Sequence, residues 1–187
     1  MSRSTEPSPW YVAASPAISR VALAGIAGSL PYLAMKLYWT WGGTVGSPGN
    51  LADQFRKNGA PEFLVWLERH GIDFTAVGTV LGITLLGALT RPWGQTFPRW
   101  VPLLHGKRVP RWIPLTPGWA TALTLAPYGT MGVTELIFGN LNEENLAGMP
   151  KGVYVIGFVG FFSLGVSIAV CTVAYQRRTR HARALAR

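Results

Sequence analysis

The sequence has little cysteine and little acid. Cys171 is the single cysteine among 187 residues, which excludes an intramolecular disulfide, a redox pair of cysteines and a zinc site built from several cysteines. Only 8 residues are acidic against 17 Lys and Arg, and charged residues make up 13% of the chain, whereas about 25% is typical of soluble globular proteins. Hydrophobic residues make up 49%, so the composition favours one domain in a membrane.

Four apolar runs have about the length that crosses a bilayer, whose hydrocarbon core of roughly 30 Å needs about 20 helical residues. They cover residues 20–41, 72–90, 118–138 and 152–175. The sequence therefore predicts an all-α membrane protein with four transmembrane helices. The expected organisation is a flexible cytoplasmic arm at residues 1–19, a four-helix transmembrane domain at residues 20–175 and a basic cytoplasmic tail at residues 176–187.

The charges between these runs predict the orientation. The second connection carries five Lys and Arg and the tail carries five Arg, both without acid, whereas the first and third connections each have a net charge of −1. Because cytoplasmic segments are enriched in Lys and Arg, both termini and the second connection are expected to face the cytoplasm across the plasma membrane. The first run lacks a following cleavage site of small residues and is interpreted as a retained signal anchor. No nucleic-acid partner is predicted, because the basic residues are needed at the membrane.

The second connection contains an internal repeat, FPRWVPL at residues 97–103 and VPRWIPL at residues 109–115. Two prolines per unit disfavour a continuous helix, so both units are expected to be extended and to form a hairpin against the inner leaflet. Trp prefers the headgroup zone and Arg pairs with lipid phosphates. The expected partners are membrane lipids, including anionic headgroups; a simple positive-inside anchor, a membrane-protein partner and a homo-oligomer remain alternatives. The expected headgroup residues are Arg99, Trp100, Lys107, Arg108, Arg111 and Trp112.

The first connection is expected to hold a short interfacial helix. Pro61 suits a first helical turn, and Gly71 suits the residue just past a helix end. Between them, apolar and aromatic residues share one face at helical spacing: Phe63, Trp66, Leu67 and His70.

The sequence contains no metal or nucleophile constellation. The histidines, His70, His105 and His181, fall in three segments that cannot all converge in this topology, so neither a metal site nor a cofactor is predicted. Small residues at helical spacing are expected to let helices approach closely. These are Ala24 with Gly28, Gly78 with Gly82, and Ser163 with Ser167 and Cys171.

Lys36 and Glu135 are the charged residues that lie inside the apolar runs, away from the ends of the runs. A charge inside a membrane is costly and by default indicates a functional site with a partner. Both residues fall roughly 5 to 8 Å below the outer surface at about 1.5 Å per helical residue, so they are expected to pair. Polar residues beneath each charge, with Pro31 and Pro127 next to a tyrosine, predict a kinked, polar cavity open to the outside. The expected ligand-binding residues are Ser29, Tyr32, Lys36, Thr124, Tyr128 and Glu135.

Three functions follow as hypotheses. The leading one is a non-enzymatic membrane protein that binds a lipid, a small apolar ligand or a membrane partner, with Lys36 and Glu135 either a structural clamp or part of the site. The first alternative is a membrane-embedded enzyme in which Glu135 is the acid or base, Lys36 stabilises charge, and Tyr32 or Tyr128 donates a proton to an apolar substrate. The second is a transporter or transporter subunit, which the off-midplane position of Glu135 disfavours.

The stretch YWTWGGTVG at residues 38–46, together with RPWG at residues 91–94 and the PRW repeat, resembles small four-span integral membrane proteins of actinobacteria, mostly uncharacterised. The resemblance covers the first two thirds of the chain. It implies an integral plasma-membrane protein and supplies no catalytic residue.

Overall fold

The computed structural model describes residues 11–184 apart from 48, 58, 100 and 140–149. These residues form helices and no strand, which confirms the all-α prediction for the described part of the chain. The helices are α1 (Pro16–Thr40), α2 (Leu51–Lys57), α3 (Glu62–Arg69), α4 (Phe74–Thr90), the 3-10 helix η1 (Pro92–Gly94), α5 (Trp112–Phe138) and α6 (Lys151–Ala184).

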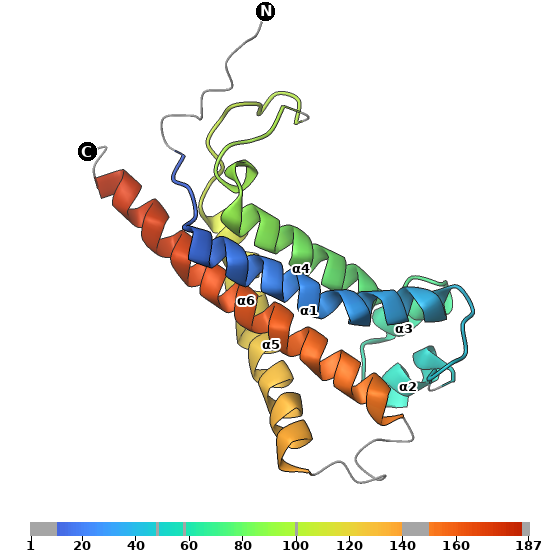
Figure 1. The fold of residues 1–187 in the computed structure, drawn as a ribbon. Coiled ribbons are helices and arrows are strands. Elements are labelled where there is room, and N and C mark those ends of the chain that lie inside the picture. Colours follow the sequence, from blue (N-terminus) through green and yellow to red (C-terminus); the bar gives the residue numbers. More distant parts are fainter. Residues whose placement is uncertain (1–10, 48, 58, 100, 140–149, 185–187) are drawn as a thin grey trace, which may run out of the picture.

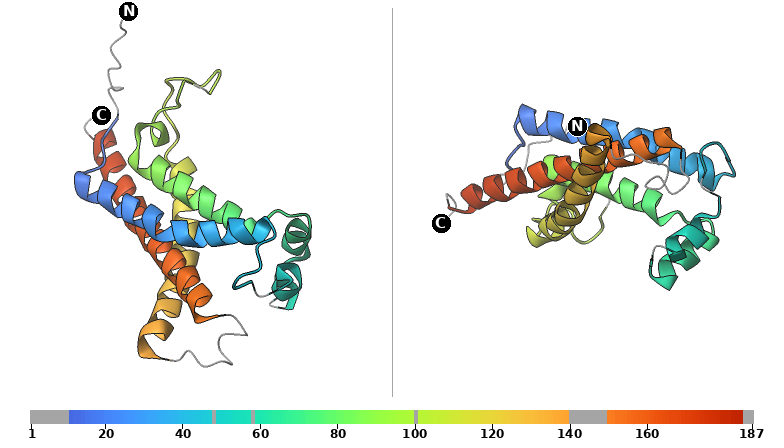
Figure 2. Two further views of the ribbon diagram at one scale, coloured as in Figure 1. Left: turned by 45° about the vertical axis from the view of Figure 1, so that its right-hand side comes forward. Right: turned by 90° about the horizontal axis from the view of Figure 1, so that it is seen from below.

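Helix α6 is the central element, because α1, α4 and α5 all pack against it (Figure 1). The start of α1, residues 91–111 and the last turns of α6 lie together at one end of the molecule, which we call the basic end (Figures 1 and 2). The opposite end, called the cap end, carries α2 and α3, the end of α1 and the start of α4 (Figure 1). The start of α6 also lies toward the cap end.

The core between these helices combines large apolar side chains with close helix contacts. Leu86 and Leu89 of α4 pack with Ile168 and Tyr175 of α6, and all four are fully buried. Large side chains cannot fit where the backbones approach, so small residues stand there.

The predicted small-residue contacts are partly confirmed. A Cβ on Gly28 of α1 would clash with Ser163, and one on Gly82 of α4 would meet Leu164 at 2.9 Å, so both helices approach α6 closely. Gly78 instead has open space beside it, and Ala24 is exposed. The tightest approach of α5 to α6 was not predicted and occurs at Gly129, where a Cβ would clash with the α6 backbone.

The basic end is held by the last turns of α6. Arg178 donates a hydrogen bond to the carbonyl oxygen of Leu89 and its guanidinium lies 5.2 Å from the centre of the Tyr175 ring. Tyr175 donates its hydroxyl to the carbonyl oxygen of Gly94 at 2.9 Å. The carbonyl groups at the end of α4 and in η1 thus accept hydrogen bonds from side chains that lie more than 80 residues away in sequence.

Helices α1 and α6 both extend beyond the predicted spans. Helix α1 begins at Pro16, with Ser15 as its N-cap, so residues 16–19 belong to the helix and not to the expected arm. Residues 11–15 have no regular structure, and the Gln95 side chain both donates to and accepts from the backbone of Val12, at 2.9 and 3.1 Å. Helix α6 continues to Ala184, so the first part of the expected tail is helical.

Two helices are long and apolar enough to cross a membrane among the described residues, namely α1 and the Lys151–Arg180 part of α6. A third crossing is present if α3 and α4, which meet at a bend of 98°, count as one span. Helix α5 has 27 residues but contains several Thr, Gly and Pro, which lower its mean hydropathy. Four crossings therefore remain a prediction.

The repeat connection reverses direction as expected, but both units differ from the prediction. The described part of the first unit is not extended throughout, because it turns after Pro98 and places Leu103 at a φ of 68°. Thr96 and Arg108 form an antiparallel bridge, and the Val109 amide donates to Gln95, which makes a short hairpin. The second PRW unit is not extended, because α5 begins at Trp112. Pro114 lies in the first turn of α5, where a helix leaves its N–H groups without an intrahelical partner, so proline is tolerated there.

The cap end is built from α2 and α3. The predicted short helix of the first connection is confirmed as α3, which begins after Pro61 and ends at Arg69 with His70 as its C-cap. Its place at a membrane surface remains a prediction. Val65 is its fully buried residue, whereas Phe63 and Trp66 are exposed. The aromatic face of α3 therefore points away from the protein, as an interfacial helix requires. Helix α2 was not predicted.

Candidate functional site

A cavity of about 390 Å³ lies at the cap end, between α1, α2, the start of α4, α5 and α6. Three predicted site residues, Tyr32, Lys36 and Tyr128, line it together. Most of the remaining wall is aromatic or apolar: Met35, Trp39, Leu51, Phe55, Val153, Tyr154, Phe158 and Phe161. The structure thus brings the cationic residue of α1 and a tyrosine of α5 to one hollow.

Lys36 pairs with Asp73, so the expected pair of Lys36 with Glu135 is wrong. The Lys36 Nζ atom lies 2.8 Å from the Asp73 Oδ2 atom, and the two residues are only 3% and 5% exposed. The Lys36 ammonium also lies 5.5 and 5.6 Å from the ring centres of Trp39 and Phe55. Helix α1 contacts α4 and α6, which explains why Lys36 meets the residue at the start of α4.

Asp73 occupies the N-cap position of α4 and organises a chain of hydrogen bonds. Its Oδ1 atom accepts from the backbone amides of Thr75 and Ala76, each at 2.9 Å, and from the Thr75 hydroxyl at 2.6 Å. The Tyr32 hydroxyl donates to the Thr75 hydroxyl at 2.9 Å. Tyr32, Thr75, Asp73 and Lys36 therefore form one connected polar network along the cavity wall.

Glu68 adds a second carboxylate near this network. Burial raises the pKa of Glu68 above its ordinary value, the nearby carboxylate of Asp73 raises it further, and Lys36 opposes both effects. Its Oε2 atom is buried and has no hydrogen-bond partner within the described part of the chain. Lys36 thus lies near two carboxyl groups and forms its ion pair with Asp73.

Glu135 lies behind the cavity wall. Its Oε2 atom accepts a hydrogen bond of 2.6 Å from the hydroxyl of Tyr154, which itself lines the cavity. Glu135 is not among the lining residues. A molecule in the cavity would meet the Tyr154 phenol before it met the Glu135 carboxylate.

Tilted aromatic rings in contact with one another form part of the cavity wall. The Tyr128 ring centre lies 5.2 Å from that of Phe158 and 5.6 Å from that of Phe161, and Phe161 lies 4.7 Å from Tyr32. Ring pairs at such distances hold each other in fixed orientations. This wall presents a large apolar surface with phenol groups at its edges.

Two predicted site residues lie elsewhere. Ser29 is buried outside the cavity, and its hydroxyl donates to the carbonyl oxygen of Ile26 at 2.9 Å. Thr124 is exposed on α5, and its hydroxyl donates to the carbonyl oxygen of Ala120 at 3.0 Å. Both hydroxyls are used within their own helices. Helical spacing below a charge therefore predicts the two tyrosines of the cavity correctly, but not these two residues.

Sequence reasoning missed Asp73, Thr75 and Tyr154. Asp73 directly precedes an apolar run with Thr75 two residues later, which is the pattern of a helix N-cap. The sequence therefore does carry a signal for Asp73, which otherwise contributes only to the net charge of −1 of the first connection. No sequence signal identifies Tyr154, because its role depends on the packing of α5 against α6.

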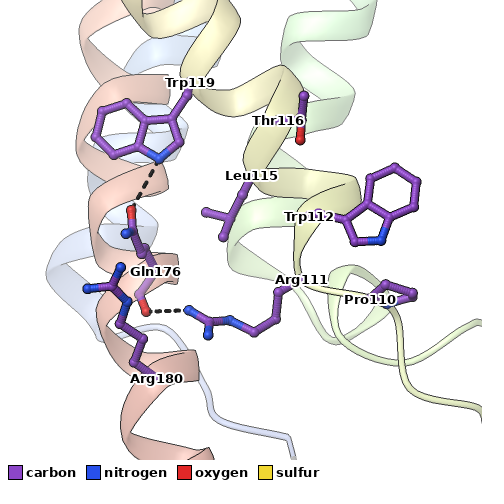
Figure 3. Close-up of a pocket in the computed structure, with 8 residues that line it drawn as sticks. All are labelled: Pro110, Arg111, Trp112, Leu115, Thr116, Trp119, Gln176 and Arg180. Atoms are coloured by element: carbon purple, nitrogen blue, oxygen red, sulfur yellow. Dashed lines mark hydrogen bonds between the residues drawn. The ribbon is translucent and has the colours of Figure 1, made fainter.

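The expected headgroup residues differ in their exposure and contacts. Arg99, Lys107 and Arg108 are exposed on the hairpin, and Trp100 lies outside the described residues. Arg111 donates through Nε to the Thr179 hydroxyl at 2.9 Å and through Nη2 to the carbonyl oxygen of Gln176 at 3.0 Å, so it also joins α5 to α6 (Figure 3).

The described side chains contain no group of three or more His, Cys, Asp or Glu residues that could hold a metal ion. No protein-family model, curated protein or solved structure matches the chain.

Proposed function

We propose that the chain is a non-enzymatic integral protein of the plasma membrane that binds a small, largely apolar ligand in the cavity at the cap end. The observation that carries the proposal is the cavity itself, which joins an aromatic wall to the buried Lys36–Asp73 pair. Ligand sites are typically hollows of about 300–1,000 Å³ with apolar walls and a few polar groups that fix orientation. A volume of about 390 Å³ lies within that range.

In the proposed placement, α1, α4, α5 and α6 each cross the bilayer, with the basic end in the cytoplasm. The 27 residues of α5 extend over about 40 Å, which exceeds the hydrocarbon core of roughly 30 Å. The positive-inside rule supports the orientation, because the basic connection and the tail lie at one end of the molecule. Helix α3 then rests on the outer surface with Phe63 and Trp66 in the interface.

The proposed ligand is a small ring-containing molecule with one polar group. Rings of the ligand stack on the wall formed by Tyr128, Phe158 and Phe161, and its polar group is oriented by the tyrosine hydroxyls and Lys36. Because Lys36 is already paired with Asp73, its net charge is compensated. A neutral ligand therefore suits the site better than an acid or a base.

The test is purification in lipid discs followed by identification of bound small molecules by mass spectrometry. Gly157 lines the cavity, and a Cβ added there meets nothing within 4 Å, so Gly157→Leu has room to enter the hollow and is expected to occupy part of it. Gly152 is an exposed residue of the same helix with equal room, and Gly152→Leu is the matched control. We expect the bound molecule to be lost in the first variant and retained in the second. Equal retention, or a wild-type protein that carries no small molecule, would refute the proposal.

A membrane-embedded enzyme is the second candidate, and the hydrogen bond between Tyr154 and Glu135 is the observation that favours it. A phenol that takes a proton from a substrate can pass its own proton to a carboxylate behind it, so the pair can act as a general base. Under the binding proposal, the molecule recovered from the protein stays chemically unchanged on incubation. Turnover that is lost in Glu135→Gln while binding persists would instead establish the enzyme.

A further inference from the structure

The two ends of the molecule differ sharply in charge. The acidic residues that the structure describes all belong to the cap-end half: Asp53, Glu62, Glu68, Asp73 and Glu135. The basic end carries nine basic residues and, within the described chain, no acid: Arg20, Arg91, Arg99, Lys107, Arg108, Arg111, Arg177, Arg178 and Arg180. Arg111 apart, none of these cations forms an ion pair with a described carboxylate.

One hollow at this end concentrates cationic, aromatic and hydroxyl groups. It has a volume of about 640 Å³ and lies between the first turns of α5 and the last turns of α6 (Figure 3). Its lining residues are Pro110, Arg111, Trp112, Leu115, Thr116, Trp119, Gln176 and Arg180. Figure 3 shows the guanidinium groups of Arg111 and Arg180 beside Gln176, with the Trp119 indole above them.

The cationic groups of this hollow are placed by the fold. Arg111 is held by Thr179 and Gln176 of α6, and Trp119 is fixed by a hydrogen bond of 3.1 Å from its Nε1 atom to the Gln176 Oε1 atom. Arg180 is exposed, and none of the described carboxylates lies within ion-pair distance of it.

We propose that this hollow binds the headgroup of an anionic phospholipid of the inner leaflet, with its phosphate at Arg180, beside the hydrogen-bonded Arg111. The indoles of Trp112 and Trp119 lie at the level of the glycerol group, where Trp is favoured, and Leu115 begins the apolar surface that the acyl chains follow. Binding at this site differs from diffuse electrostatic attraction of lipids to the exposed hairpin, because it depends on particular side chains of α5 and α6. It also lies at the opposite end from the proposed ligand cavity.

Binding of a fluorescent phosphatidylglycerol to the full chain in detergent micelles tests the assignment. Measurements in about 0.5 M salt screen diffuse attraction beyond a few ångströms, so the remaining affinity reports the site. Arg180→Gln is expected to weaken binding about tenfold, the effect of losing one charge-assisted hydrogen bond. Arg177→Gln is the matched control, because Arg177 is also exposed on α6 but borders a different hollow, beside Ile18. It is expected to leave the affinity unchanged.

A second variant keeps the test decisive if Arg180→Gln disturbs folding. Trp112 is 68% exposed, so Trp112→Ala leaves the core intact and is expected to weaken binding as well. Equal losses in the Arg180 and Arg177 variants, or equal binding of phosphatidylglycerol and phosphatidylcholine, would overturn the proposal. Full competition by glycerol phosphate at the same concentration would also overturn it, because the site would then be one for a soluble phosphate.

Discussion

The pair of Lys36 and Asp73 predicts a large, non-additive effect on stability. Both side chains are almost fully buried and their charged atoms are 2.8 Å apart. Removing one member leaves the other charge buried without compensation, which costs about 3–5 kcal/mol. Lys36→Met and Asp73→Asn each remove one charge. Asn retains an oxygen that can cap α4, so the second variant tests the charge and not the cap.

The double variant, Lys36→Met with Asp73→Asn, distinguishes coupled charges from two independent effects on stability. Independent effects would add to about 6–10 kcal/mol. If the two charges depend on each other, the double variant is expected to lose no more than about 3 kcal/mol, because a neutral pair leaves no charge buried alone. The measurement is reversible unfolding in mixed micelles, followed by circular dichroism. Glu62→Gln is the control, because the Arg56–Glu62 pair is 43% and 72% exposed and its loss is expected to have no measurable effect. Additive losses would refute the coupling.

Three further predictions concern single positions. Tyr32→Phe removes the hydroxyl that donates to Thr75 and is expected to lower the free energy of unfolding by about 1 kcal/mol in the same assay. Gly129→Ala is expected to cost about 1–3 kcal/mol by forcing α5 from α6, whereas Gly78→Ala, with open space beside it, should be neutral or stabilising. The raised pKa of Glu68 means that, above pH 4.5, the folded state binds more protons than the unfolded state. The free energy of unfolding of the wild type therefore falls as the pH rises above 4.5. Glu68→Gln is expected to be more stable than the wild type near neutral pH and to lose this advantage below pH 4.5.

The helices were predictable where the hydrophobic signal is continuous, and the errors have identifiable physical causes. Residues 72–90 predict a helix that the structure has at Phe74–Thr90, because a run of this kind satisfies its backbone only as a helix in a membrane. Helix α2 has seven residues, too few to show a period. The prediction that the second PRW unit is extended is wrong, because proline disfavours only the interior of a helix and Pro114 lies in the first turn of α5.

The candidate site was predictable in part. Tyr32, Lys36 and Tyr128 do share a cavity, because depth along a helix follows directly from residue count. The partner of Lys36 could not be derived in this way. Depth matched Lys36 with Glu135, but which helices are neighbours depends on packing, and α1 lies beside α4 and α6. A charge at the end of a run, such as Asp73, can be as close to a buried lysine as one within a run.

The shortness of α4 has a consequence for the surrounding lipid. Its 17 residues extend over about 25 Å, between the charged residues Asp73 and Arg91, while the hydrocarbon core measures roughly 30 Å. In the proposed placement, lipids beside α4 must thin by about 5 Å to keep those charges in water. The apolar stretch of α6, at residues 152–175, extends over about 36 Å and is accommodated by tilt. This hydrophobic mismatch favours short acyl chains along one side of the protein and biases the chain toward thinner bilayers.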